Sequence, residues 1–168
     1  MTTPAEIDPT KATAPGIPTG FLPAAAGSGF ASRNATFYGQ WVNEQLLLGF
    51  RVDESHCNMG GVLHGGMLAT FADTLLPYAA MYQALGGRRF LPTISLQVDY
   101  LATAAMGAWV QGQAAVLRMT RNMVFMQGLV TVDGAPIARL SGIFKLGTPR
   151  FELAGDFLNI KGERPLST

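Results

Sequence analysis

The sequence predicts an α+β domain in which a long central helix is wrapped by a curved antiparallel sheet. The order and the length of the elements support this prediction. Residues 67–85 carry apolar side chains at helical spacing, and four strand patterns follow them. Strands usually run for about five or six residues, so strands of ten residues or more suit a sheet that curls around something long. The helix is the long element available.

The N-terminal part of the chain, residues 1–35, is expected to be an extended or disordered arm. Half of the ten prolines fall in its first 29 residues, at Pro4, Pro9, Pro15, Pro18 and Pro23. Prolines at this density interrupt both helices and sheet ladders. Such an arm either hangs free or lies across a neighbouring subunit. The domain itself is expected over residues 36–150, with a C-terminal tail over residues 151–168.

The elements before the central helix carry weaker signals. The pattern from Thr36 to Leu48 is mixed, and a short helix is predicted over residues 40–47. Residues 47–52 have the pattern of a strand, which runs into a polar loop over residues 53–58.

The central helix, residues 67–85, has a wide apolar face. Its members are Leu68, Phe71, Leu75, Tyr78, Ala79 and Tyr82. Gly86 and Gly87 are expected to end the helix, and the following arginines to complement its dipole. Pro77 removes the hydrogen bond to the carbonyl of Asp73, so a local kink is expected there. That kink either shapes a pocket or is tolerated without a role.

Four antiparallel strands are predicted after the helix, over residues 93–101, 108–119, 123–132 and 136–146. Asp133-Gly134 is a strong hairpin signal between the last two, and Arg121-Asn122 is a weaker one before them. The third strand has apolar side chains on both faces: Val124, Met126, Val130 and Val132 on one, Phe125 and Leu129 on the other. Two apolar faces indicate that a partner covers the outer side of the sheet.

The composition disfavours several classes of protein. Charged residues make up 14% of the chain, against about 25% in typical soluble domains, and the net charge is +1. Disorder driven by charge and a strongly basic nucleic-acid binder are therefore disfavoured. No apolar stretch of about 18 residues predicts a membrane-spanning helix. Burial against another subunit is the leading explanation for the missing charges.

The cysteine and histidine content gives no signal for a disulfide or a metal. The single Cys57 excludes an internal disulfide framework and has no identified activator, so it is interpreted as a loop thiol. His56 and His64 lack an accompanying carboxylate cluster, and no metal site is predicted. The N-terminus carries two acids before its first lysine and no uninterrupted apolar stretch, so no secretory signal is predicted and a cytoplasmic location is expected.

One acidic residue stands out by its position. Asp73 lies inside the most apolar helix of the chain, where it either points to water or serves a function. Residues 58–66, just upstream, read Asn-Met-Gly-Gly-Val-Leu-His-Gly-Gly. A carboxamide, an imidazole and four glycines thus converge on a helix N-terminus, whose free N–H groups and positive dipole end can hold a developing oxyanion. This neighbourhood favours a functional Asp73.

The run N-x-x-G-x-x-H-G-G, followed by Asp nine residues after the His, resembles the active-site signature of hotdog-fold acyl-CoA thioesterases. Within that superfamily it is most similar to the branch of the phenylacetate-pathway thioesterase. The matching positions are Asn58, Gly61, His64, Gly65, Gly66 and Asp73. The strand over residues 93–101 resembles the strand that follows the helix in the family. The resemblance covers residues 49–146 and implies a hotdog fold.

The resemblance also implies roles for single residues. Asp73 would act as a general base on water or as a nucleophile on the thioester carbonyl, and the Gly65 N–H would polarise that carbonyl. His64 would support the thioester or the loop, Asn58 would orient the carbonyl or the water, and Thr93 would help to hold the water. Gly61 and Gly66 would contribute to substrate binding. In this family the site is shared between two subunits.

The expected activity is hydrolysis of an acyl-CoA, or of an acyl chain on a carrier protein, to acid and thiol. No cofactor is expected, since coenzyme A is part of the substrate, and neither nucleic acid nor membrane is an expected partner. The assembly is expected to be a homodimer or a homotetramer. Arg88, Arg89, Arg118 and Arg121 either bind the phosphates of coenzyme A or are ordinary surface charges.

Two other functions stay open. A non-catalytic acyl-CoA binder would keep the fold without the reaction. A hotdog hydratase or dehydratase would need a different acid–base pair, usually with a histidine at a later helix position, and none is visible here.

Overall fold

The computed structural model describes residues 16–25, 29–147, 149–154 and 158–161. Parts of the expected arm and tail, and residue 148, lie outside the described residues. The strands are β1 (Leu22–Pro23), β2 (Tyr38–Val42), β3 (Gln45–Arg51), β4 (Gly87–Arg89), β5 (Thr93–Tyr100), β6 (Trp109–Met119), β7 (Met123–Val132), β8 (Ala135–Lys145) and β9 (Pro149–Ala154). The helical elements are α1 (Phe30–Asn34), a 3₁₀ turn (Glu54–His56), α2 (Gly65–Ala80) and a π-helical turn (Met81–Leu85).

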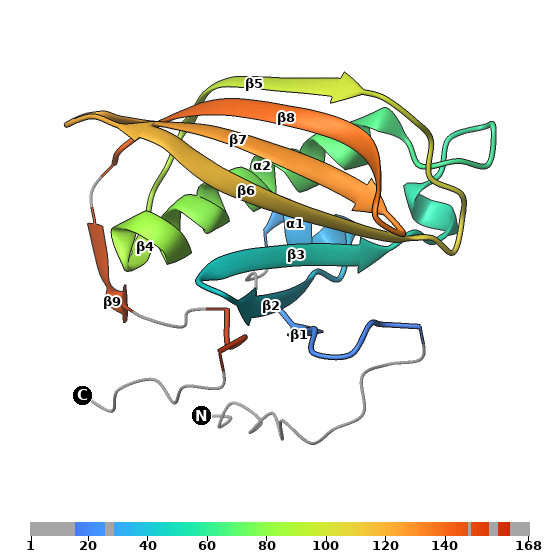
Figure 1. Cartoon of the computed structure of the whole chain (residues 1–168), viewed down its shortest axis with the longest axis horizontal. Helices are drawn as coiled ribbons and strands as arrows, with labels where there is room; N and C mark the ends of the chain where they lie inside the picture. Colours follow the sequence, from blue (N-terminus) through green and yellow to red (C-terminus); the bar gives the residue numbers. More distant parts are fainter. Residues whose placement is uncertain (1–15, 26–28, 148, 155–157, 162–168) are drawn as a thin grey trace.

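Seven of the described strands form one antiparallel sheet in the order β1-β2-β3-β6-β7-β8-β5, and β4 pairs with β9 separately. The long strands β6, β7 and β8 arch over α2, which lies along the inner face of the sheet (Figure 1). The β6–β7 and β7–β8 registers each shift once, and such irregularities bend a strand locally. The predicted central helix and curved antiparallel sheet are confirmed.

The short helix predicted over residues 40–47 is wrong. This segment forms a hairpin in which β2 pairs with β3. Asn43 and Glu44 make its turn with positive φ angles of 50° and 59°, as in a type I′ turn, where asparagine is favoured. Alternate residues of β3 are fully buried: Leu46, Leu48 and Phe50. The alternation is not apparent in the sequence, because residues 46–48 are all leucines. It follows from the packing of β3 against α2.

The central helix begins two residues earlier than predicted, at Gly65. Gly86 ends the helical segment with a positive φ of 65°, as expected of a C-terminal glycine. Gln83, in the π-helical turn, accepts the N–H of Leu46 at 3.3 Å and donates to the C=O of Ala114 at 3.1 Å. Its amide therefore bridges β3 and β6 just beyond the point where their pairing ends.

Two short elements, β1 and α1, lie in the part of the chain expected to be an arm. β1 pairs with β2 at the edge of the sheet opposite β5. Phe21, just before β1, is buried against Trp109, with ring centroids 5.0 Å apart. Ala35, just after α1, is buried as well. The described residues 16–25 and 29–35 therefore pack against the domain.

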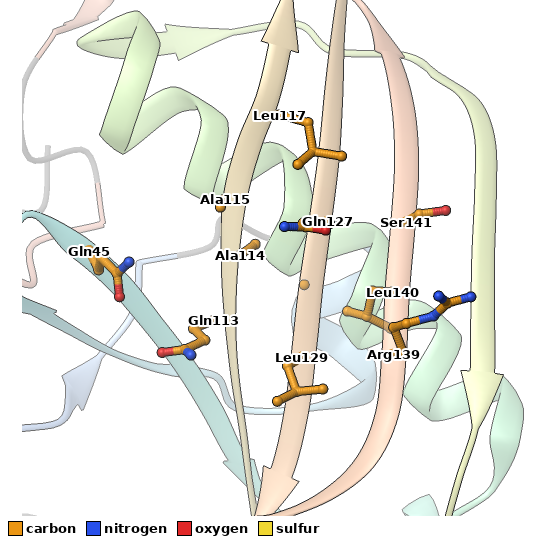
Figure 2. A pocket seen from close by; sticks show the side chains of 11 residues that line it. Gln45, Gln113, Ala114, Ala115, Leu117, Gln127, Leu129, Arg139, Leu140 and Ser141 are labelled. Atoms are coloured by element: carbon orange, nitrogen blue, oxygen red, sulfur yellow. The ribbon is translucent and has the colours of Figure 1, made fainter.

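The outer face of the sheet also carries apolar side chains. On β7, Val124, Met126 and Val130 are buried on the inner face, whereas Phe125 and Leu129 are half-buried on the outer one. A hollow of about 410 Å³ lies on this outer face. Figure 2 shows the side chains that line it, with α2 behind the sheet. Gln113, Leu117 and Gln127 are among the side chains that line it. The hollow contains none of the residues in the predicted motif.

Candidate active site

The glycine-rich segment folds as a tight hairpin that leads directly into α2. The N–H of Asn58 donates to the C=O of Val62 at 2.9 Å, and the N–H of His64 donates to the C=O of His56 at 2.8 Å. Gly61 turns the chain with a φ of 72°, a conformation that favours glycine, and its N–H donates to the C=O of Asn58 at 3.0 Å. The hairpin places His64 immediately before the first turn of α2.

His64 caps the helix. Its Nδ1 accepts the N–H of Gly66 at 2.8 Å, so the neutral ring carries its proton on Nε2. Its C=O accepts the N–H groups of Met67 and Leu68 at 3.0 and 3.1 Å. The N–H of Gly65 has no acceptor within the described part of the chain, and it lies at the positive end of the helix dipole. Gly65, rather than Gly66, thus offers a free donor to an anionic group.

Asn58 is exposed, and the hairpin fixes which end of its amide is free. Oδ1 accepts the N–H of Gly60 at 2.8 Å and lies 3.5 Å from the N–H of Val62. Because the oxygen is used within the hairpin, the NH₂ group is left to donate elsewhere. Asn58 can therefore supply a hydrogen bond to a bound carbonyl or water.

Asp73 lies on the exposed side of α2, and Thr93 at the start of β5 holds one of its oxygens. Thr93 Oγ1 donates to Asp73 Oδ1 at 2.6 Å. The hydroxyl proton is thereby committed to the carboxylate, so the Thr93 oxygen can only accept a hydrogen bond from a further group such as water. α2 runs through Pro77 without interruption, although the proline removes the N–H that would pair with the Asp73 carbonyl.

The predicted residues form two separate groups within the chain. Asn58, His64 and Gly65 make one, and Asp73 with Thr93 makes the other. Gly65 and Asp73 are eight helical residues apart, which at 1.5 Å per residue is about 12 Å along the axis. A single thioester carbonyl cannot contact both within one chain.

Tyr100, at the end of β5, was missed by sequence reasoning. Its hydroxyl donates to the C=O of Gly65 at 2.8 Å, and a Cβ at position 65 would lie 3.4 Å from its ring. The sequence signal for this contact is weak, because Tyr100 only ends a predicted strand and its partner is 35 residues away.

Sequence reasoning also missed that α1 lines a cavity near the start of α2, because residues 1–35 were expected to be an arm. A cavity of about 470 Å³ lies between α1 and the start of α2, and its lining includes Phe30, Arg33, Cys57 and His64. The buried His56 connects the 3₁₀ turn to the end of α1, because its Nε2 lies 2.7 Å from the C=O of Asn34. A carbonyl oxygen only accepts hydrogen bonds, so Nε2 is the donor.

The four arginines lie at the other end of α2. Arg88 and Arg89 line a cavity of about 290 Å³ together with Tyr78. Burial raises the pKa of the Tyr78 hydroxyl, and the positive charge of Arg88 partly offsets this rise. Arg118 and Arg121 are exposed near the β6–β7 turn. Backbone hydrogen bonds of residues 145–147 connect that turn to residues 90–92, so all four gather where α2 ends. This end lies opposite the start of α2, where Gly65 is the first residue (Figure 1).

Neither a metal centre nor a membrane span is found in the described residues. No three His, Cys, Asp or Glu side chains come together there in a way that could hold a metal ion. In the same ranges, no helix is both long enough and apolar enough to cross a membrane.

A curved antiparallel sheet wrapped around one long helix is the architecture of a hotdog protein, and here that helix begins with a free N–H donor. A sequence model described as the thioesterase superfamily matches residues 60–135, which include Gly65, Asp73 and Thr93. A provisionally named esterase of Pseudomonas aeruginosa is 31% identical over 131 residues, which cover 77% of this chain and 97% of that protein. The chain therefore belongs to the thioesterase superfamily.

Further relatives extend the comparison. The mouse (Mus musculus) acyl-coenzyme A thioesterase 13 is 28% identical over 82 residues, 49% of this chain and 57% of that protein. The crystal structure of zebrafish thioesterase superfamily member 2 matches with a TM-score of 0.63 at 27% identity, covering 73% of this chain and 90% of that one. The phenylacetic acid degradation protein PaaI of Thermus thermophilus matches with a TM-score of 0.60 at 19% identity, covering 70% and 97%, and this likeness shows the fold alone.

Proposed function

We propose that the protein hydrolyses an acyl-CoA, or an acyl chain on a carrier protein, to a free acid and a thiol. The observation that carries the proposal is the free N–H of Gly65 at the start of α2, close in the chain to the donor amide of Asn58. A donor of this kind stabilises the tetrahedral oxyanion of thioester cleavage, and its loss typically lowers the rate by about 10²–10³. The mouse relative, named an acyl-coenzyme A thioesterase, supports the substrate class.

Asp73 supplies the reacting carboxylate in this proposal. With Oδ1 held by Thr93, the other oxygen takes a proton from a water that attacks the thioester carbonyl carbon. The carbonyl electrons move onto the oxygen, which accepts the Gly65 N–H. When the carbonyl re-forms, the C–S bond breaks and the proton moves from Asp73 to the departing thiolate. In the alternative mechanism, Asp73 attacks the carbonyl carbon directly, the C–S bond breaks to release the thiolate, and water then cleaves the resulting mixed anhydride, supplying the proton that the thiolate takes up.

The two groups meet in one site if Asp73 and Thr93 come from one subunit and Gly65 from another, so we propose a homodimer, alone or paired into a tetramer. The separation of about 12 Å within one chain supports this arrangement. β5, which carries Thr93, is an edge strand of the described sheet. Its unpaired N–H and C=O groups form a template for pairing with a second strand.

The remaining predicted residues enter the proposal in other ways. Gly61 and Gly66 shape the hairpin and the helix cap, as their φ angle and hydrogen bond indicate. The guanidinium groups gathered where α2 ends are proposed to bind coenzyme A phosphates, since their planar fork suits phosphate. Reversing the charge of Arg88 or Arg121 should then raise KM for acyl-CoA without changing kcat.

The test is release of free thiol from short, aryl and medium-chain acyl-CoAs. Asp73→Ala and Asn58→Ala should each lower kcat, the former by about 10²-fold or more because a general base contributes 10²–10⁴-fold. Asp133→Asn is the matched control: Asp133 lies exposed in the β7–β8 turn with a φ of 49°, which asparagine also adopts. Its activity should equal that of the wild type.

Each alternative function gives a distinct result. Binding of several acyl-CoAs without thiol release would identify a non-catalytic binder. Addition or loss of water across a C=C bond, with the thioester intact, would identify a hydratase or dehydratase. Thiol release that is unchanged in Asp73→Ala would refute the mechanism. A single turnover in ¹⁸O-water that labels the Asp73 carboxylate would select the nucleophilic mechanism over the general-base one.

A further inference from the structure

We propose that Tyr100 is a positioning residue that holds the Gly65–Gly66 peptide, and through it the orientation of the free Gly65 N–H. The Tyr100 hydroxyl donates to the C=O of Gly65 at 2.8 Å, and Nδ1 of His64 accepts the N–H of Gly66 at 2.8 Å. Both polar groups of one peptide are thus bonded to side chains from different elements. The inference rests on the proposed thioester hydrolysis, in which the Gly65 N–H holds the oxyanion.

The peptide on the other side of Gly65 is held as well. Its C=O belongs to His64 and accepts the N–H groups of Met67 and Leu68. The Gly65 Cα therefore lies between two fixed peptide planes, and its N–H keeps one direction. Transition-state stabilisation by a donor depends on such preorganisation, because a donor that must first reorient stabilises the oxyanion less.

Two adjacent glycines benefit from support beyond the helix itself. Glycine has the largest backbone freedom of any residue, so the first hydrogen bonds of α2 hold a Gly–Gly step less firmly than they would hold other residues. A Cβ at position 65 would sit 3.4 Å from Cε1 and Cζ of Tyr100, so the ring packs directly over the glycine. The ring and the hydroxyl of Tyr100 together restrict the position that sequence alone leaves most flexible.

Tyr100 can do this without being important for the fold. It is 55% exposed at the end of the edge strand β5, where its backbone pairs with Ala138. Loss of an exposed hydroxyl usually changes stability little, so an effect on the reaction separates from an effect on folding. β5 also carries Thr93, which contacts Asp73. The same strand therefore contacts both groups of the site, Gly65 through Tyr100 and Asp73 through Thr93.

The experiment compares Tyr100→Phe, which keeps the ring, with Tyr100→Leu, which removes it. Thiol release by Tyr100→Phe should show kcat lowered about tenfold and KM within twofold, because a misplaced donor weakens binding of the transition state more than of the substrate. Tyr100→Leu should lose more. Tyr38→Phe, a hydroxyl deletion in β2, is the matched control and should keep the wild-type kcat. The melting temperature of Tyr100→Phe should stay within about 2 °C of the wild type.

A second readout does not require activity. In ¹⁵N spectra of the full chain, the Gly65 and Gly66 amides should broaden by exchange in Tyr100→Phe and stay sharp in Tyr38→Phe. Unchanged Gly65 and Gly66 signals, or an unchanged kcat, would overturn the proposal. If the wild type cleaves no thioester but these amides still broaden in Tyr100→Phe, the positioning role of Tyr100 is supported and the proposed function is wrong. The two failures are therefore distinguishable.

Discussion

His56 lies buried at the junction of three backbone segments, and both of its ring nitrogens are used. Nδ1 accepts the N–H of Asp53 at 3.0 Å, and Nε2 donates to the C=O of Asn34 at 2.7 Å. Its own C=O accepts the N–H of His64. A ring whose two nitrogens are both hydrogen-bonded to backbone groups has no lone pair left for a metal. His56 instead connects α1, the 3₁₀ turn and His64, the residue that caps α2.

Asp53, at the start of that 3₁₀ turn, should make stability depend on acid pH. Hydrogen bonding from Ser55 lowers the pKa of the Asp53 carboxyl, partial burial opposes this lowering, and the backbone N–H groups of Ser55 and His56 support it. A lowered folded-state pKa means that the stabilisation is complete above the unfolded value, near 3.9, and is lost as the pH falls through the folded value. Asp53→Ala should therefore lower the free energy of unfolding by about 1 kcal/mol at pH 7, as for a lost cap, and by less near pH 3.

Urea unfolding at pH 7, 5, 4 and 3 measures this difference. Glu54→Ala is the control, since the side chain of this neighbouring acid makes no hydrogen bond within the described residues. A difference between wild type and Asp53→Ala that stays constant down to pH 3 would contradict the assignment.

The sequence was sufficient to group those candidate residues that lie close together along the chain. Asn58, His64 and Gly65 share one hairpin-to-helix junction, so their spacing alone carries the geometry that the structure shows. Thr93 was found by its resemblance to a family position, and it does contact Asp73. Tyr100 was missed because its contact with Gly65 joins the far end of a strand to a helix start. That contact depends on how β5 is registered on β8, which no local pattern specifies.

At the scale of elements, glycines in the sheet let α2 approach closely. A Cβ on Gly112 would collide with Leu75, and one on Gly142 would lie 2.8 Å from Leu76 and 2.7 Å from Phe144. These three side chains are fully buried, so they have little room to move away. The apolar face predicted for the helix over residues 67–85 included Leu75 but not Leu76, although both are fully buried against the sheet. The glycines opposite were not predicted, because their role appears only once β6 and β8 cross α2.

Gly142→Ala should accordingly destabilise the protein. Adding a methyl group to a well-packed core costs about 1–3 kcal/mol, which outweighs the smaller gain from restricting the unfolded chain. Chemical denaturation should show a lower midpoint with an unchanged slope. Ser141→Ala is the matched control on the exposed face of β8 and should stay within about 0.5 kcal/mol of the wild type. A Gly142→Ala variant as stable as the wild type would show that the helix can shift to make room.

At the scale of the whole molecule, the low charge content coincides with uncovered apolar surface. Three large side chains at or next to the edge strand β5 are more than half exposed: Ile94, Tyr100 and Leu101. On the outer face, Arg139 at the hollow of Figure 2 is paired with Asp99 at 2.6 Å. Hydrogen bonds from Gln97 and Arg139 lower the pKa of Asp99, so this pair stays ionised at neutral pH. These exposed apolar side chains are the surface that the proposed homodimer would cover.

A shared site makes a quantitative prediction for mixed assemblies. Asp73→Ala and Asn58→Ala each remove a different group of the site, so either variant alone should have little activity. In a twofold dimer that contains one subunit of each, one site has both defects and the other has none. If subunits exchange at random in an equal mixture, half of the dimers are mixed, and activity should recover to about one quarter of the wild-type value. Thiol release before and after subunit exchange measures it. If the site lay within one chain, the mixture would keep the mean of the two low activities.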